Sequence, residues 1–135
     1  MAKSIEAIEG IGAKYGKKLK AAGCGSPKTL LRDGATRKGR KEICNKTGIS
    51  DKIVLRCVNM ADLFRIKGVA TQYAELLEAA GVDTVKELRK RNAANLTEAM
   101  AKTNTKKKLV RQLPSESMVK SWISQAKKLK PAVTY

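Results

Sequence analysis

Apolar residues recur every three or four positions in two stretches of this chain. Such spacing places side chains on one face of an α-helix, so each stretch predicts an amphipathic helix that buries one side. The apolar positions are Ile5, Ile8, Ile11, Tyr15 and Leu19 in the first stretch, and Leu63, Ile66, Val69, Tyr73 and Leu77 in the second. No segment shows the sustained alternation, with β-branched enrichment, that predicts a strand. The pattern therefore predicts an all-α protein without strands.

Residues that end and begin helices stand at the borders of these stretches. Gly23 and Gly81 each follow a short alanine-rich run, and glycine in that place predicts that a helix ends at a left-handed residue. Further helices are expected to begin where Ser, Thr or Pro stand in starting positions. The predicted N-caps are Ser26 before Pro27, Thr84 in a capping box with Glu87, Ser50 and Ser115.

The two stretches are also similar in sequence, at an offset of 58 residues. Residues 8–23 and 66–81 share 7 identities in 16 positions, whereas ordinary composition predicts roughly one. The chain is therefore predicted to be a tandem duplication, with a first repeat at 1–62 and a second repeat at 63–135. No linker rich in Pro, Ser or Gly separates them, so we expect the repeats to be closely packed or joined by a continuous helix.

Positive charge dominates the composition. The 135 residues carry 29 Lys and Arg against 12 Asp and Glu, and with no His the net charge is +17. A net charge of only roughly 2–8 is sufficient to keep a small domain soluble. The excess of positive charge therefore predicts a polyanionic partner. Double-stranded DNA is the first candidate, and RNA or an acidic protein is the second. An acidic membrane surface would attract the same charge, but we expect no membrane partner, and no stretch approaches the ~20 apolar residues of a span.

The Cys and His content bounds the chemistry. Cys24, Cys44 and Cys57 have no CxxC spacing and the chain has no His, so we expect neither a metal site nor a disulfide framework. This cysteine usage and the lack of an apolar leader are typical of the reducing cytoplasm. No carboxylate pair or nucleophile–base pair stands out, and His, the usual proton carrier, is absent. We therefore expect a protein without catalytic residues, not an enzyme.

A Gly-apolar-small motif between helical segments occurs in both repeats. The stretches Ile8-Glu9-Gly10-Ile11-Gly12-Ala13-Lys14-Tyr15-Gly16 and Ile66-Lys67-Gly68-Val69-Ala70-Thr71-Gln72-Tyr73-Ala74 resemble the helix-hairpin-helix DNA-binding motif. Degenerate hairpins at 44–50 and 111–115 would complete a two-hairpin unit in each repeat, and the whole chain is similar to a bacterial family of uncharacterised proteins built from such repeats. The resemblance implies hairpins that grip the duplex backbone across the minor groove. It also implies a monovalent cation at a hairpin turn in some members, and no other cofactor is expected.

The small residues of the motif serve two different needs. Gly10 and Gly68 are glycine in both repeats, which predicts a backbone angle that a Cβ would strain. Gly12 corresponds to Ala70, so this position tolerates a Cβ and is expected to allow close approach of a ligand. A helix that begins just after Gly12 points free N–H groups outward, and that arrangement suits a phosphate group.

Backbone amides and cationic side chains together form the predicted DNA-binding set. Lys17 and Lys20 follow the first hairpin, whereas Glu75 and Glu78 stand at the matching positions of the second, so the first hairpin is expected to be the main contact. Contacts to phosphate groups alone carry no sequence preference. The candidate phosphate-binding residues are Gly10, Ile11, Gly12, Ala13, Lys14, Lys17, Lys38, Arg40, Gly68, Ala70, Lys106 and Lys107.

The sequence thus predicts a double-stranded DNA-binding protein without sequence preference, located in the cytoplasm and associated with the nucleoid. Two alternatives stay open. One is a structural or protein–protein interaction module, in which the acidic Glu75 and Glu78 would face a partner; the other is binding to structured RNA, which the charge suits equally well. Aromatic residues make up only 4% of the chain, which disfavours a platform that stacks single-stranded bases.

Overall fold

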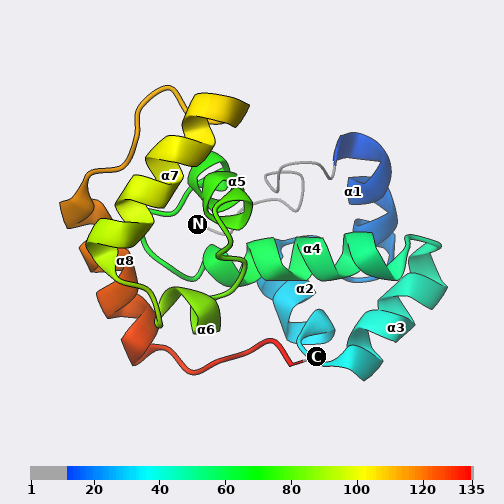
Figure 1. The fold of residues 1–135 in the computed structure, drawn as a ribbon. Coiled ribbons are helices and arrows are strands. Elements are labelled where there is room, and N and C mark those ends of the chain that lie inside the picture. Colours follow the sequence, from blue (N-terminus) through cyan, green and yellow to red (C-terminus); the bar gives the residue numbers. More distant parts are fainter. Residues whose placement is uncertain (1–11, 135) are drawn as a thin grey trace. The chain divides into compact units, whose positions relative to one another are not determined.

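The computed structural model describes residues 12–134, and within them it contains eight α-helices and no strand (Figure 1). The prediction of an all-α protein is confirmed. The helices are α1 (Gly12–Ala21), α2 (Pro27–Gly34), α3 (Arg37–Thr47), α4 (Asp51–Leu63), α5 (Thr71–Ala79), α6 (Val85–Leu88), α7 (Ala93–Lys107) and α8 (Glu116–Lys128). No described helix is both long enough and apolar enough to cross a membrane.

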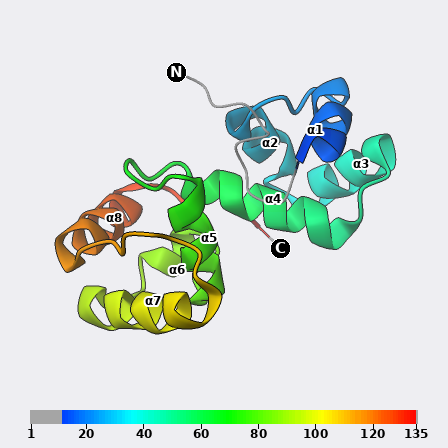
Figure 2. The same ribbon diagram turned by 90° about the horizontal axis from the view of Figure 1, so that it is seen from above.

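The helices divide between two compact units, which Figure 2 shows from a second direction. Unit 1 contains the chain up to Asp62 together with the C-terminal segment from Ala132, and unit 2 contains Leu63–Pro131. The C-terminal segment, which the sequence-based division assigned to the second repeat, therefore belongs to unit 1. Thr134 attaches it there, because its backbone N–H donates to the carbonyl oxygen of Ala35 at 2.8 Å.

In unit 1, α1 and α2 both pack against α3. Each of these helices turns its apolar stripe inward, and α4 adds a further apolar row. Removal of these side chains from water is the main force that stabilises the unit. The buried apolar residues of this core include Leu19, Leu30, Ile43, Val54 and Val58.

In unit 2, α5 packs against α7, while α7 and α6 both pack against α8. Trp122 is the largest fully buried side chain in the described part of the chain, with 2% of its surface exposed. The buried apolar residues around this packing include Leu77, Leu88, Met100 and Val119.

Two glycines end helices as the sequence predicts. Gly23 after α1 has φ +89° and Gly81 after α5 has φ +98°, the left-handed region that glycine adopts without strain. After α1, the N–H of Cys24 donates to the Leu19 carbonyl at 2.8 Å, and the N–H of Gly23 donates to the Lys20 carbonyl at 3.1 Å. The same two bonds recur after α5. This pair of bonds is a Schellman motif, which satisfies carbonyl groups that the helix end would otherwise leave free.

The predicted N-caps are confirmed. The Ser26 hydroxyl accepts from the Thr29 N–H at 3.2 Å and the Thr29 hydroxyl accepts from the Ser26 N–H at 3.0 Å, so a capping box starts α2 with Pro27 in its first turn. The hydroxyls of Ser50, Thr84 and Ser115 likewise accept a hydrogen bond from a backbone N–H in the first turn of α4, α6 and α8 respectively. At α6 the predicted capping box is incomplete, because the Glu87 carboxylate pairs with Arg91 at 3.0 Å and does not accept from the Thr84 N–H.

Elements of the two units follow one another in the same order. The first residue of α2 and the first residue of α6 stand 58 positions apart, as do the glycines that end α1 and α5. Helix α3 precedes α4 as α7 precedes α8. A duplication would leave this correspondence, and the duplication itself stays a prediction.

Candidate functional site

Two tight turns share the geometry that the sequence motif predicts. In the Gly48 turn (Gly48-Ile49-Ser50) and the Gly68 turn (Gly68-Val69-Ala70), the glycine has φ +74° and +97° respectively. The middle residue, Ile49 or Val69, is buried, while the residues on either side of it are exposed. A buried apolar residue anchors each turn, so the backbone around it lies at the surface just before a helix begins.

The Gly68 turn is held against α8 by side chains. The Gln125 amide accepts from the Lys67 N–H at 2.8 Å and donates to the Lys67 carbonyl at 3.1 Å. Arg65 donates to the Lys130 carbonyl at 2.7 Å. The Trp122 ring lies beside Tyr73, with 5.4 Å between ring centroids. These contacts fix the turn on a rigid support, which a binding site on a loop requires.

Helix α5 begins directly after the Gly68 turn without a capping side chain. Ala70 is its N-cap residue, with φ −87° and ψ 174°, and it makes no side-chain hydrogen bond. The other N-caps that the structure describes at α2, α3, α6, α7 and α8 each accept a backbone N–H with a side-chain oxygen. Because alanine has no side-chain oxygen, the N-cap residue of α5 accepts no hydrogen bond from the first turn through its side chain.

Gly68 is predicted to be the most sensitive of the turn residues. A Cβ there would sit 3.1 Å from Trp122 Nε1, and φ +97° adds backbone strain. We expect Gly68→Ala to lower the free energy of unfolding by roughly 1–2 kcal/mol. Gly81→Ala is the matched control, because Gly81 has φ +98° but its nearest neighbour is the flexible end of Arg91 at 3.5 Å. Urea unfolding of both variants measures the difference, and an equal loss would show that the Trp122 contact has no effect.

The structure describes only part of the first predicted hairpin. Gly10 and Ile11, and with them the predicted turn and its monovalent cation, lie outside the described residues. Helix α1 begins at Gly12 and includes Ala13, within one residue of the predicted start. Lys14 and Lys17 are exposed on α1, and α1 packs on α3, which carries the exposed Lys38 in its first turn.

Most of the predicted cationic contacts are free to meet an anion. Lys14, Lys17, Lys38, Lys106 and Lys107 are exposed and form no ion pair with any residue of 12–134. Lys106 and Lys107 lie in the last turn of α7, where the helix dipole also favours positive charge. The structure therefore leaves these five charges for a ligand.

Arg40 has a different role from the one that its charge predicts. It is 7% exposed, and its guanidinium donates to the carbonyls of Gly34 at 3.0 Å, Ala35 at 3.1 Å and Thr134 at 2.6 Å. The side chain therefore satisfies backbone groups at the end of α2 and in the C-terminal segment. We do not include Arg40 in the proposed DNA contact.

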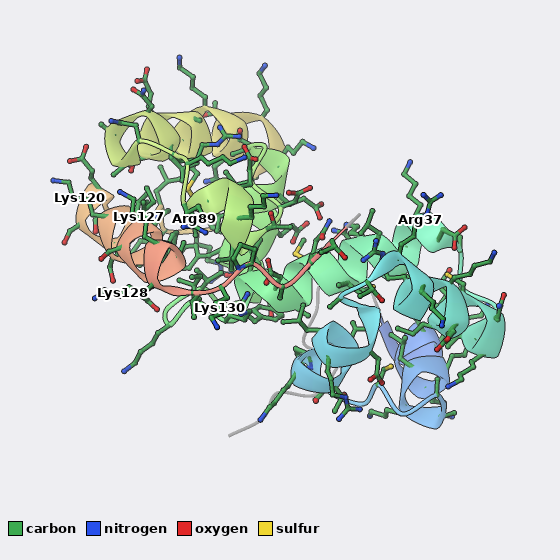
Figure 3. All side chains as sticks on the ribbon, turned by 90° about the horizontal axis from the view of Figure 1, so that it is seen from below. Arg37, Arg89, Lys120, Lys127, Lys128 and Lys130 are labelled. Carbon is green, nitrogen blue, oxygen red and sulfur yellow. The ribbon has the colours of Figure 1, made fainter. Side chains whose placement is uncertain are left out.

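Sequence reasoning overlooked a group of basic residues in unit 2. Lys120, Lys127, Lys128 and Lys130 come from α8 and the segment after it, and Arg89 comes from the end of α6, which packs on α8 (Figure 3). Lys127, Lys128 and Lys130 are exposed and form no ion pair within the described part of the chain. The basic residues that recur along the sequence of α8 could have indicated this group.

Two cysteine thiols lie beside carboxylates. Cys24 Sγ donates to Asp33 at 3.7 Å and Cys44 Sγ donates to Asp51 at 3.0 Å. Burial raises the pKa of each thiol to about 11, and the charge and hydrogen bond of the neighbouring carboxylate add to this rise. Both thiols therefore stay protonated near neutral pH, and a protonated thiol is a poor nucleophile and metal ligand. Among residues 12–134, no three His, Cys, Asp or Glu side chains gather into a group that could hold a metal ion.

Comparison with known proteins identifies a family. Residues 9–129 match the family described as a domain of unknown function (DUF4332), and the chain belongs to this family because the match covers most of its length. No curated protein and no solved structure matches the chain.

Proposed function

We propose that this protein binds double-stranded DNA through its phosphate groups, without preference for sequence. The supporting observation is the surplus of exposed cationic side chains that no carboxylate neutralises, on a chain of net charge +17. Residues 1–62 carry 14 Lys and Arg against 6 Asp and Glu, and residues 63–135 carry 15 against 6. Both units therefore contribute to the attraction of a polyanion.

The turn geometry supports a backbone contact. At the Gly68 turn, Gly68 and Ala70 are exposed and lack bulky side chains, and the N-terminus of α5 follows them. A phosphate oxygen accepts hydrogen bonds from amides at a helix N-terminus, and the three residues of the turn carry no polar side chain that could recognise a base. The resemblance to helix-hairpin-helix turns leads to the same proposal, with a nucleoid location.

The aromatic and apolar residues disfavour other partners. Trp122 is buried and Tyr73 is half-buried against it, so neither ring offers an open face to an unpaired base. Leu113 and Met118, which are 42% and 37% exposed, are the only large apolar side chains that the described residues expose. A protein partner that docks on an apolar patch would find little surface to cover.

A salt series tests the proposal. Fluorescence anisotropy with two unrelated DNA duplexes should give affinities within a few-fold of each other at each salt concentration. The logarithm of the affinity should fall linearly with the logarithm of salt, by roughly 0.9 per phosphate neutralised. No affinity for duplex DNA near 100 mM salt would refute the proposal. Tighter binding to duplex RNA or to single-stranded DNA would replace double-stranded DNA as the ligand.

A charge-matched pair of variants locates the contact. Lys14→Gln/Lys17→Gln removes two exposed charges from α1, and Lys28→Gln/Lys86→Gln removes two exposed charges from the first turns of α2 and α6. The first variant should lower the slope of the salt dependence by roughly 1–2, because each lost phosphate contact contributes about 0.9. The control variant should keep the wild-type slope. Equal slopes for both variants would mean that α1 is not a DNA contact.

A further inference from the structure

A groove lies between α3 and α4, beside the Gly48 turn that joins them. Its volume is about 650 Å³, within the range of roughly 300–1,000 Å³ that is typical of ligand sites. One face of α3 forms the first wall, because the lining residues on this helix recur at intervals of three or four. The lining residues are Arg37, Arg40, Lys41, Cys44 and Asn45 from α3, Ile49 and Ser50 from the turn, and Asp51 and Leu55 from α4.

The charge of this groove is positive. Arg37 and Lys41 are exposed on the α3 wall and form no ion pair with the residues that the structure describes; Figure 3 labels Arg37 at the start of that helix. Arg40 lies between them with its guanidinium on backbone carbonyls. Asp51 is the single acid of the lining, and its carboxylate accepts from the Cys44 thiol at the turn end. Two cationic groups are thus left for a ligand.

The remaining lining residues show what kind of ligand fits. Ile49 and Leu55 add apolar surface, and Asn45 and Ser50 add neutral hydrogen-bonding groups. A metal cation would be repelled by the two free cationic groups. A phosphate diester suits the groove, because its oxygens accept from guanidinium and ammonium groups while the attached sugar carbons can lie on apolar side chains.

We propose that the α3–α4 groove receives a backbone phosphate of the bound DNA, held by Arg37 and Lys41 with Asn45 as a neutral donor. This inference rests on the proposed DNA binding. It adds a second phosphate contact on unit 1, in which the two cationic residues, Arg37 and Lys41, lie outside the hairpin at 44–50. The Cys44–Asp51 hydrogen bond keeps the one carboxylate of the groove turned to the thiol.

Charge-matched variants test this groove. Arg37→Gln/Lys41→Gln should lower the affinity for a DNA duplex at 100 mM salt about tenfold or more and reduce the salt slope by roughly 1–2. Lys28→Gln/Lys86→Gln, with the same loss of charge outside the groove, should stay within about threefold of the wild type. Both variants change exposed side chains only, so far-UV circular dichroism and melting temperature should match the wild type.

A second measurement uses inorganic pyrophosphate as the probe. In ¹H–¹⁵N spectra of the wild type, pyrophosphate should shift the amide signals of Asn45 and Ser50, and it should leave them unshifted in Arg37→Gln/Lys41→Gln. If the wild type binds DNA but the groove variant matches the control and pyrophosphate does not shift these amides, the groove proposal is overturned and DNA binding stands. If the wild type binds no DNA, DNA binding fails and the groove assignment falls with it, whatever pyrophosphate does.

Discussion

Gly39→Ala is expected to unfold unit 1. Gly39 lies in the first turn of α3, and its Cα faces the backbone carbonyl oxygen of Asp33 in α2 so closely that a Cβ would overlap it. Alanine raises helix propensity by roughly 0.5–1 kcal/mol, but a clash with backbone can be relieved only by separating the two helices. We expect a net loss of about 3 kcal/mol or more, which is comparable with the whole stability of a unit of this size.

Two other glycines provide graded controls for this result. A Cβ on Gly34 would lie 2.5 Å from Val58 Cγ2, a side-chain methyl that can shift in part, so Gly34→Ala should cost less than Gly39→Ala. A Cβ on Gly25 would meet only Lys20 Cγ at 3.5 Å, an ordinary contact, so Gly25→Ala should be nearly neutral. Far-UV circular dichroism and urea unfolding of the three variants measure the order. A Gly39→Ala variant as stable as Gly25→Ala would show that α2 and α3 do not pack this closely.

Arg40→Met is expected to lower the free energy of unfolding by about 3 kcal/mol. Methionine keeps much of the apolar stem but removes the guanidinium that donates to three backbone carbonyls. Hydrogen bonds to charged groups contribute roughly 1.5–3 kcal/mol each, and they are not additive when one side chain makes them all. Arg40→Lys should give an intermediate loss, since an ammonium cannot reach all three carbonyls with the planar geometry of guanidinium.

Arg37→Met is the control for this prediction. Arg37 is exposed one turn earlier on the same helix, so its replacement should change stability by less than about 0.5 kcal/mol. Amide exchange gives an independent measurement: Arg40→Met should speed exchange of the Thr134 amide, which donates to Ala35 at 2.8 Å. Wild-type exchange at Thr134 together with a loss below 1 kcal/mol would contradict the role assigned to Arg40.

The helices and their ends were predictable because they depend on residues that are close in sequence. The left-handed conformations of Gly23 and Gly81 follow from the absence of a Cβ, and the caps at Ser26 and Ser115 need only a hydroxyl within three residues of a free amide. The positive φ of Gly68 was predictable for the same reason, whereas Gly10 lies outside the described residues.

The candidate site was less predictable from the sequence. The excess of positive charge identifies a class of ligand, but it does not say which cations reach the surface. Arg40 and Lys41 are neighbours in sequence, yet Arg40 is buried on carbonyls and Lys41 lines an open groove. The helical rotation of 100° per residue points these two adjacent side chains in different directions. The neighbouring elements then decide which of the two is buried.

By itself the sequence determined the all-α class, the helix borders, the apolar faces and the charge, since each depends on local spacing or on composition. Only the tertiary structure decided which distant groups meet. Arg40 donates to the carbonyls of both Ala35 and Thr134, although Ala35 and Thr134 stand 99 positions apart in the sequence. No periodic pattern in the sequence marks that contact. The need for glycine at Gly39 and the groove between α3 and α4 likewise arise from the distance at which helices pack, which the close fit of interior atoms sets.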